Sequence, residues 1–219
     1  MDYSLAPHIS YGLVGGRAVV LDLAADRYLR FGASETATLA ALGAGSAVRP
    51  FHVQKLLDRG IIRSGSGSPI APVARPHPVA SAIECDTAGG GISAIEVFGA
   101  SVGALLVMRT RGLARTIARW RTIKARGGRD GVPLRDDPDR TAAIARGFAE
   151  ARTAVPMPRL CVPDSLALAR SLWRRGLSAD VYFGVQLEPL LAHAWTQAGG
   201  LILSDPLNIA ADYTPVFRL

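Results

Sequence analysis

The sequence predicts an α+β protein made of two domains. Apolar runs separated by a pair of glycines open the chain, which is typical of a β-hairpin. Segments with apolar residues at helical spacing follow, and a stretch rich in Gly, Ser and Pro divides the 219 residues. Hydrophobic residues make up 49% of the chain and charged residues 20%, so the composition is that of a globular protein rather than a disordered one.

The first segment is expected to be rich in β-strand. Residues 8–14 and 17–23 are apolar runs on either side of Gly15 and Gly16. Two glycines in this position predict a tight hairpin turn, because glycine accepts the positive φ that such turns require. Residues 26–31 predict a third strand after a turn at residues 24–25.

Two helices are expected after these strands. The first runs to Leu42, with Ser34 as its N-cap and the acidic Glu35 in its first turn. The second covers residues 50–59, and Gly60 ends it. Its apolar face consists of Phe51, Val53, Leu56 and Leu57.

Composition also predicts where the domains end. Residues 64–78 are dominated by Gly, Ser and Pro, and such a segment buries too little apolar surface to pack. We therefore expect a first domain at residues 1–64, a linker at 65–79 and a second domain at 80–219.

The second domain is expected to begin with helices at residues 92–108, 113–124 and 139–153. The first is the most apolar stretch of the chain, but it contains Ser93, Glu96 and Ser101 and is at the short limit for a membrane span. We therefore expect a buried helix there.

Positive charge is concentrated after this helix. The formal net charge is +7 and the pI about 10.1. Eight basic residues and no acid occur in one segment, which predicts either a solvated helix face or, in a winged-helix protein, a nucleic-acid interface. They are Arg109, Arg111, Arg115, Arg119, Arg121, Lys124, Arg126 and Arg129.

The two cysteines, Cys85 and Cys161, are too few for a disulfide framework in a chain of this size. The N-terminal residues are polar and do not resemble a signal peptide. Both observations favour a reducing, cytoplasmic compartment. Cys85 is expected to be structural.

Cys161 is placed where its thiol becomes reactive. Pro163 is favoured in a first helical turn, and apolar residues at helical spacing continue to Gly176, which ends the helix. The N–H groups and dipole of a helix N-terminus lower the pKa of a thiol and can also hold an oxyanion. A buried, inert cysteine is the alternative interpretation.

His193 and Asp205 complete a candidate catalytic triad. Strands are expected at residues 179–185, 190–197 and 201–204. If residues 198–200 form a three-residue loop, Gln197 pairs with Leu201, and His193 lies directly opposite Asp205 on the same face. A two-residue turn would place the pair on opposite faces. In the first register Cys161 is the nucleophile, His193 the base and Asp205 the residue that orients it.

At these residues the chain resembles the B proteins of lasso peptide biosynthesis, which are leader peptidases with a papain/transglutaminase-like fold. The resemblance rests on residues 161–168, 183–185, 192–195 and 213–215 and on Asp205. It implies a cytoplasmic cysteine protease that removes the leader of a precursor peptide. It also implies a partner, an ATP-dependent macrolactam synthetase, and no metal or cofactor.

The first domain is similar to RiPP recognition elements, which are small winged-helix domains. The similar residues are 19–22 and 27–31 and the helices after them. In that family the leader peptide adds as a strand beside the third strand and packs against the last helix. The resemblance thus implies leader-binding residues on both elements: Tyr28, Leu29, Arg30, Phe31, Val53 and Leu57. The stretch between Leu42 and Pro50 is short for the family's three helices, so one is expected to be reduced to a turn.

Two other functions remain open from the sequence. The same triad serves acyl transfer to an amine, because hydrolysis and transfer share an acyl-enzyme. A winged-helix nucleic-acid binder would instead use the basic segment and would not need Cys161. The resemblance favours the peptidase, with neither nucleic acid nor membrane as a partner.

Overall fold

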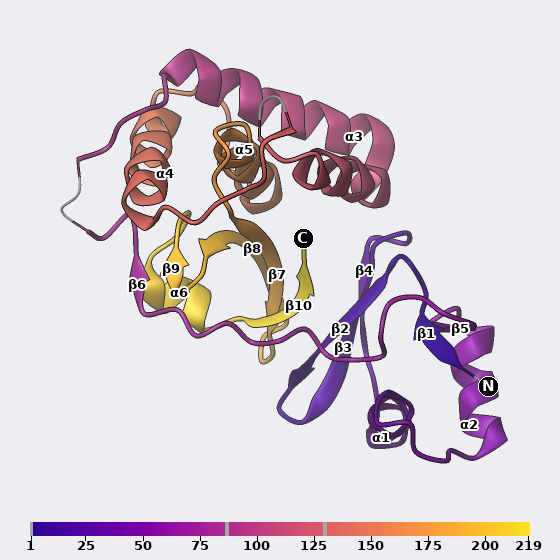
Figure 1. The fold of residues 1–219 in the computed structure, drawn as a ribbon. Helices are drawn as coiled ribbons and strands as arrows, with labels where there is room; N and C mark the ends of the chain where they lie inside the picture. The colour runs from indigo at the N-terminus through magenta and orange to yellow at the C-terminus, as the bar shows by residue number, and fades with distance from the viewer. Residues whose placement is uncertain (1, 86–87, 129–130) are drawn as a thin grey trace. The chain divides into compact units, whose positions relative to one another are not determined.

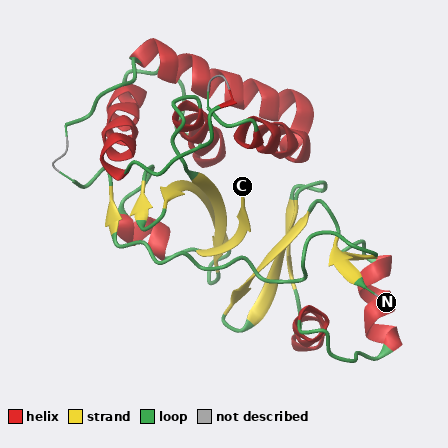
Figure 2. Ribbon diagram, in the orientation of Figure 1, coloured by secondary structure: helices red, strands yellow, loops and turns green. Residues whose placement is uncertain are grey.

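A computed structural model of the chain describes residues 2–85, 88–128 and 131–219, so Arg129 of the basic segment lies outside the described residues. Contacts within the chain define two compact units. The first is Met1–Ala74 with Thr214–Phe217, and the second is Arg75–Tyr213 with Arg218–Leu219. The elements are mixed α and β, in agreement with the predicted class (Figure 1, Figure 2).

The first unit contains two small antiparallel sheets. Strands β2 (Ile9–Val14), β3 (Arg17–Asp22) and β4 (Arg27–Arg30) form a meander in the order β2-β3-β4. Gly15 and Gly16 connect the first two strands with φ values of 56° and 76°, as the glycine pair predicted. Strand β1 (Tyr3–Leu5) pairs with β5 (Ile62–Ser64).

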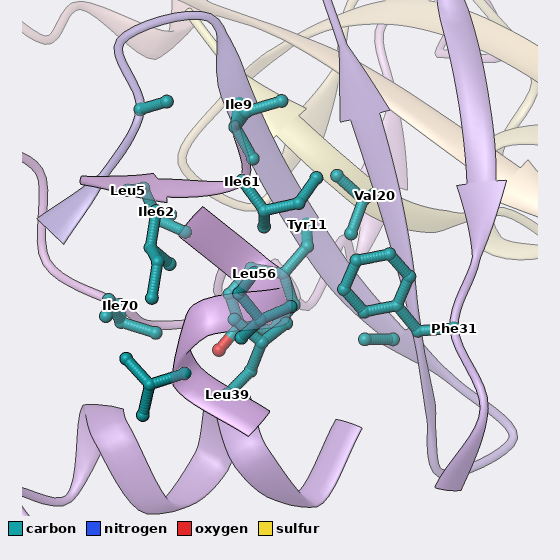
Figure 3. Packing of buried hydrophobic residues seen from close by; sticks show 13 residues of the cluster. Leu5, Ile9, Tyr11, Val20, Phe31, Leu39, Leu56, Ile61, Ile62 and Ile70 are labelled. Carbon is teal, nitrogen blue, oxygen red and sulfur yellow. The ribbon is translucent and has the colours of Figure 1, made fainter. Parts of the chain in front are cut away.

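Two helices cover this unit's core. They are α1 (Ala33–Gly43) and α2 (Pro50–Asp58), with a helix-free connection of residues 44–49 between them. Figure 3 shows the buried side chains of both sheets and both helices meeting in one cluster. Phe31, Leu39 and Leu56 lie at its centre and are at most 2% exposed. Replacing such a buried Leu with Ala costs about 2–5 kcal/mol.

The start of α1 differs from the expectation. Gly32, rather than Ser34, is the N-cap, and Ser34 lies within the helix. The Glu35 carboxylate accepts a 2.9 Å hydrogen bond from the Gly32 N–H, so the reciprocal half of a capping box fixes the helix start. The hydrogen bond from Gly32 to Glu35 therefore places the helix start two residues before the predicted cap.

The segment after β5 packs more closely than its composition suggested. Ile70 is 7% exposed and joins the core of the first unit, and the Val73 N–H donates to the Tyr11 carbonyl at 2.8 Å. The first unit therefore extends to Ala74.

The second unit contains β7, β8, β9 and β6 of a five-stranded sheet in the order β10-β7-β8-β9-β6, whose edge strand β10 is grouped mostly with the first unit. Its long hairpin consists of β7 (Asp180–Gln186) and β8 (Leu191–Ala198). The short strands β9 (Leu201–Ile202) and β6 (Ala80–Ser81) pair in parallel beyond β8, and β10 (Thr214–Arg218) is the opposite edge. A short helix, α6 (Leu207–Ala211), precedes β10.

Three longer helices accompany this sheet, and α5 (Cys161–Trp173) is the central one (Figure 1). It packs against β8 on one side and against α3 (Ala94–Ala125) on another, while α4 (Pro138–Thr153) contacts both helices. Nine of its thirteen residues are buried, which explains its continuous apolar sequence. The buried Trp120 of α3 donates its indole N–H to the Leu166 carbonyl at 2.9 Å and fixes α3 against α5.

Helix α3 joins the two helices that the sequence predicted separately. Gly112 interrupts it with φ 73° and ψ 172°, values outside the helical region. By length and composition alone α3 could cross a membrane, but Val97, Ser101 and Ala104 on its inner side are fully buried in the second unit. The expectation of a buried helix is wrong for its outer side, where Ile95 is 85% exposed.

Candidate active site

Cys161 is the first residue of α5, as predicted. The preceding Leu160 is the N-cap and has extended backbone angles, and Pro163 occupies the first turn, where its lack of an N–H has no cost. Gly176, with φ 73°, follows the end of the helix. Cys161 is exposed as a residue, and it lies at the positive end of the helix dipole.

The N-terminal part of α5 is fixed to β8 by hydrogen bonds. The Ser165 hydroxyl donates to the Ala194 carbonyl at 3.0 Å, and the Thr196 hydroxyl donates to the Ser165 carbonyl at 3.0 Å. The backbone of Ala194 lies close enough to the Cys161 thiol to lower its pKa. Cys161 is thus held next to the middle of β8, where residue 193 lies.

His193 is placed by aromatic neighbours on β8 and after α6. Its ring centroid lies 5.2 Å from that of Tyr213 and 6.5 Å from that of Trp195. Gly184 of β7 pairs with His193, and a Cβ at this glycine would lie 2.7 Å from a Trp195 ring carbon. A side chain at position 184 would therefore displace the ring that supports His193.

Asp205 reaches His193 by a different route from the one predicted. Ala198 pairs with Leu201, so the loop is the two-residue Gly199-Gly200 and the predicted three-residue register is wrong. If β9 continued, this register would place Asp205 and His193 on opposite faces. The strand instead ends at Ile202 and the chain bends over residues 203–205, which turns the Asp205 carboxylate back toward the imidazole.

The His193 Nε2 lies 2.9 Å from the Asp205 Oδ1, and both side chains are less than 20% exposed. The Ser204 hydroxyl, which accepts a 2.9 Å bond from the Thr196 N–H, donates to the other oxygen of the same carboxylate. The Ser81 hydroxyl donates to the Asp205 carbonyl at 2.7 Å. Both oxygens of the Asp205 carboxylate therefore have a hydrogen-bond partner. The Nδ1 of His193 is the ring nitrogen that is left to interact with the Cys161 sulfur.

Cys161 and His193 line the same cavity and shift each other's pKa. Burial raises the pKa of the Cys161 thiol, but hydrogen bonds from His193, Ala194 and Val162 and the charge of His193 give a net lowering. Burial lowers the pKa of His193, but its bonds to Asp205 and Cys161 outweigh this and raise it from 6.5 to about 9. Both shifts favour the charged forms, a thiolate on Cys161 and an imidazolium on His193.

Two residues that sequence reasoning did not single out, Arg152 and Asp164, fix the chain before Cys161. Arg152, at the end of α4, is 4% exposed and donates from Nε to the Asp164 Oδ1 at 2.8 Å. Its guanidinium also donates to the carbonyls of residues 155, 157 and 158. The Asp164 Oδ2 accepts the Leu160 N–H at 3.1 Å. The sequence feature that could have identified Asp164 is its position in the first turn of the helix, three residues after Cys161.

A cavity of about 290 Å³ opens at the triad. Cys161, His193 and Asp205 line it, and its apolar wall is formed by Ala145, Phe148, Ala149, Leu168 and Leu203. Among the described residues, no group of three His, Cys, Asp or Glu side chains is placed to hold a metal ion. Cys85 is half-buried and lies outside this site, with its thiol 3.1 Å from the Ser81 carbonyl.

The predicted leader-binding residues fall into two sets. Leu29 and Phe31 face the core of the first unit, whereas Arg30 is exposed on β4, the last strand of the meander. Val53 and Leu57 of α2 line a separate cavity of about 740 Å³, to which Tyr3 also contributes. Tyr28 is half-buried on β4. Phe31 next to β4 and Val53 of α2 belong to the same hydrophobic core of the first unit. No residue of β4, however, is among the residues that line the cavity at Val53 and Leu57.

Comparison with known proteins identifies a related family and a related protein. The family model of the transglutaminase-like superfamily matches residues 104–218. The microcin J25-processing protein McjB of Escherichia coli is 35% identical over 49 residues, which are 22% of this chain and 24% of that protein. The match thus spans about a quarter of that relative's length. No solved structure matches the chain significantly. These findings confirm the resemblance predicted from the sequence.

Proposed function

The chain belongs to the transglutaminase-like superfamily, and on this basis we propose that it is a cysteine peptidase that removes the leader from a lasso peptide precursor. One observation carries the proposal: Cys161, His193 and Asp205 line one cavity, where the Cys161 thiol and His193 shift each other's pKa and the His193 Nε2 lies 2.9 Å from the Asp205 Oδ1. Nucleophile, base and orienting carboxylate are thereby arranged for attack on a carbonyl. The similarity to a microcin-processing protein supports a peptide as the substrate.

In the proposed reaction the Cys161 thiolate attacks the carbonyl carbon of the scissile peptide bond, and the carbonyl oxygen becomes an oxyanion near the N–H groups at the start of α5. The His193 imidazolium then protonates the leaving nitrogen as the C–N bond breaks. This releases the core peptide with a free amine and leaves the leader as a thioester on Cys161. Water, deprotonated by His193, hydrolyses the thioester and restores the thiolate.

The first unit is proposed to bind the leader. Strand β4 ends the order β2-β3-β4, and a peptide added there would continue the meander by backbone hydrogen bonds. The half-buried Leu57 and the cavity that it shares with Val53 offer an apolar site on α2. The free amine of the released core is the group that a partner ATP-dependent synthetase would need to close a macrolactam. Cys161 must remain reduced throughout, which fits a cytoplasmic location.

A cleavage assay with the precursor peptide encoded beside the gene tests the proposal. The wild-type chain is expected to release leader and core fragments, detected by mass spectrometry, and Cys161→Ala is expected to release neither. Cys85→Ala is the matched control, because Cys85 is the other cysteine and lies outside the triad. Equal cleavage by wild type and Cys161→Ala would refute the proposal.

Acyl transfer to an amine is the second candidate, because the triad forms the same thioester in both reactions. Adding a primary amine to the assay separates the two. Hydrolysis gives a leader with a free carboxylate, whereas transfer gives a leader amide whose mass includes the amine. If the leader amide is the main product at a low amine concentration, the chain is a transferase rather than a peptidase.

A further inference from the structure

The outer side of α3 carries a row of apolar side chains that the second unit leaves uncovered. Ile95, Phe98 and Leu106 are 85%, 44% and 54% exposed, and Val102 between them is half-buried. At 100° per residue these four positions fall within about 80° of the helix circumference. We call them the apolar row. Figure 1 shows α3 along the outside of the second unit, above α5.

The fold of the second unit does not require this row. The inner side of the same helix, with Val97, Ser101 and Ala104, is fully buried and supplies the packing against α5. A contiguous row of exposed aliphatic and aromatic side chains is unusual on a protein surface and marks a site of interaction.

Positive charge borders the row. A shallow cavity of about 230 Å³ is lined by Ile95 together with Arg170 and Arg174 of the α5 end. Arg170 and Arg174 line this cavity together, and burial and the positive charges of Arg174 and Arg119 lower the pKa of Arg170, so both cations lie near Arg170. Within the described part of the chain, neither Arg119 nor Arg174 forms an ion pair.

Glu96, the acid within α3, is already neutralised. Glu96 receives two hydrogen bonds from the Arg175 guanidinium, at 2.7 and 2.8 Å. In the part of the chain that the structure describes, the border of the row is therefore cationic and its carboxylate, Glu96, is already paired. Three neighbouring arginines repel one another, and an anionic partner would relieve this repulsion.

We propose that the apolar row, with Arg119, Arg170 and Arg174, docks on an anionic lipid surface. A protein partner would need a groove shaped to receive a protruding helix face and carboxylates at matching positions. A bilayer accepts a protruding row without such a fit, since its acyl region takes up the apolar side chains and its headgroups present anions on every side. The helix lies on the surface and does not cross it, because its inner side is packed on α5 and Gly112 breaks it. This departs from the expectation from the sequence, which named no membrane among the partners.

Vesicle flotation with the full chain tests the proposal. We expect binding to vesicles of phosphatidylcholine and phosphatidylglycerol in a roughly three-to-one ratio, and no binding to phosphatidylcholine alone. The double variant Ile95→Ser, Leu106→Ser should weaken binding at least about tenfold, because it removes most of the inserted apolar surface. The control Val79→Ser, Leu190→Ser replaces apolar residues of matched exposure, 79% and 51%, outside the row and should bind like wild type.

Three outcomes would overturn the proposal. One is wild-type protein that does not float with the anionic vesicles, and another is a control variant that loses as much binding as the row variant. The third is capture by soluble polyglutamate in the absence of vesicle binding, which would identify an acidic polypeptide as the partner. Thermal unfolding of each variant shows whether a lost signal reflects the surface or the fold.

Discussion

Arg152 donates from Nε to the Asp164 Oδ1 at 2.8 Å, and this ion pair joins the end of α4 to the first turn of the helix that begins with Cys161. The same guanidinium holds three carbonyls of the connecting segment. The position of the nucleophile therefore depends on a nearly buried cation that does not itself belong to the triad. Arg152 and Asp164 are positioning residues for Cys161.

Replacing Arg152 with Met should lower the free energy of unfolding by about 3 kcal/mol, because Asp164 and the carbonyls lose their donor in a largely buried site. Asp164→Asn should keep more stability and reduce kcat for precursor cleavage, since the start of α5 is held less firmly. Urea unfolding and cleavage kinetics measure the two effects. Arg140→Met, in an exposed position of the same helix, is the control and should change neither. Unchanged kcat in Asp164→Asn would contradict the positioning role.

The pH profile of cleavage should follow the Cys161–His193 pair. The pKa of His193 is raised from 6.5 to about 9 and that of Cys161 is lowered, so the thiolate and imidazolium coexist between the lowered thiol pKa and about 9. Activity should fall below this window as the thiolate is protonated, and above about pH 9 as the imidazolium loses its proton. A folded-state pKa above the unfolded value stabilises the fold fully below pH 6.5, and this contribution is lost as the pH rises through about 9.

Asp205→Asn should move the upper limit of that profile to lower pH, because the carboxylate is a main cause of the raised His193 pKa. Asp212→Asn, an exposed acid on the same stretch of chain, should leave the profile unchanged. An upper limit that stays near pH 9 in Asp205→Asn would show that Asp205 does not control the imidazole.

The sequence carried enough information to predict the helices, because strong breakers delimit them. Pro50 and Gly60 enclose α2, and Gly176 follows α5, so the predicted ends lie within a few residues of the observed ones. The sequence of α3 has apolar residues on several sides, so it did not predict which side of the helix is buried. Periodicity could not distinguish the side that packs on α5 from the exposed apolar row.

The candidate site was predictable in its members but not in its geometry. The neighbouring glycines allow either a two- or a three-residue loop, and only the packed hairpin shows which pairing Ala198 adopts. The approach of Asp205 to His193 depends on the bend after Ile202, which Ser204 stabilises through Thr196. The role of Arg152 depends on residues 155–158, whose carbonyls accept hydrogen bonds from its guanidinium. From the sequence alone, an arginine at the end of a helix is expected to be a solvated cation.

Gly184→Ala should impair both stability and catalysis. The added Cβ would lie 2.7 Å from a Trp195 ring carbon and 2.9 Å from the Tyr213 Cβ, which are the two residues that flank His193. Overpacking of this kind costs about 1–3 kcal/mol. Gly103→Ala is the control, because a Cβ there meets no atom within 4 Å and alanine favours the helix. The midpoint of thermal unfolding and the kcat should both fall in Gly184→Ala. Neither should fall in Gly103→Ala.

Strand addition at β4 can be tested with one backbone change. The Phe31 N–H donates to the Ala18 carbonyl at 2.9 Å, so by the alternation of an antiparallel pair the Arg30 N–H points away from β3, toward the position of an added strand. Arg30→Pro removes this donor at an edge position that tolerates proline. It should weaken leader binding about tenfold and raise KM with little change in kcat. Arg30→Ala keeps the N–H and should bind more tightly than the proline variant. Fluorescence polarisation with a labelled leader peptide measures the affinities, and equal affinities for the two variants would show that the leader does not pair with this edge.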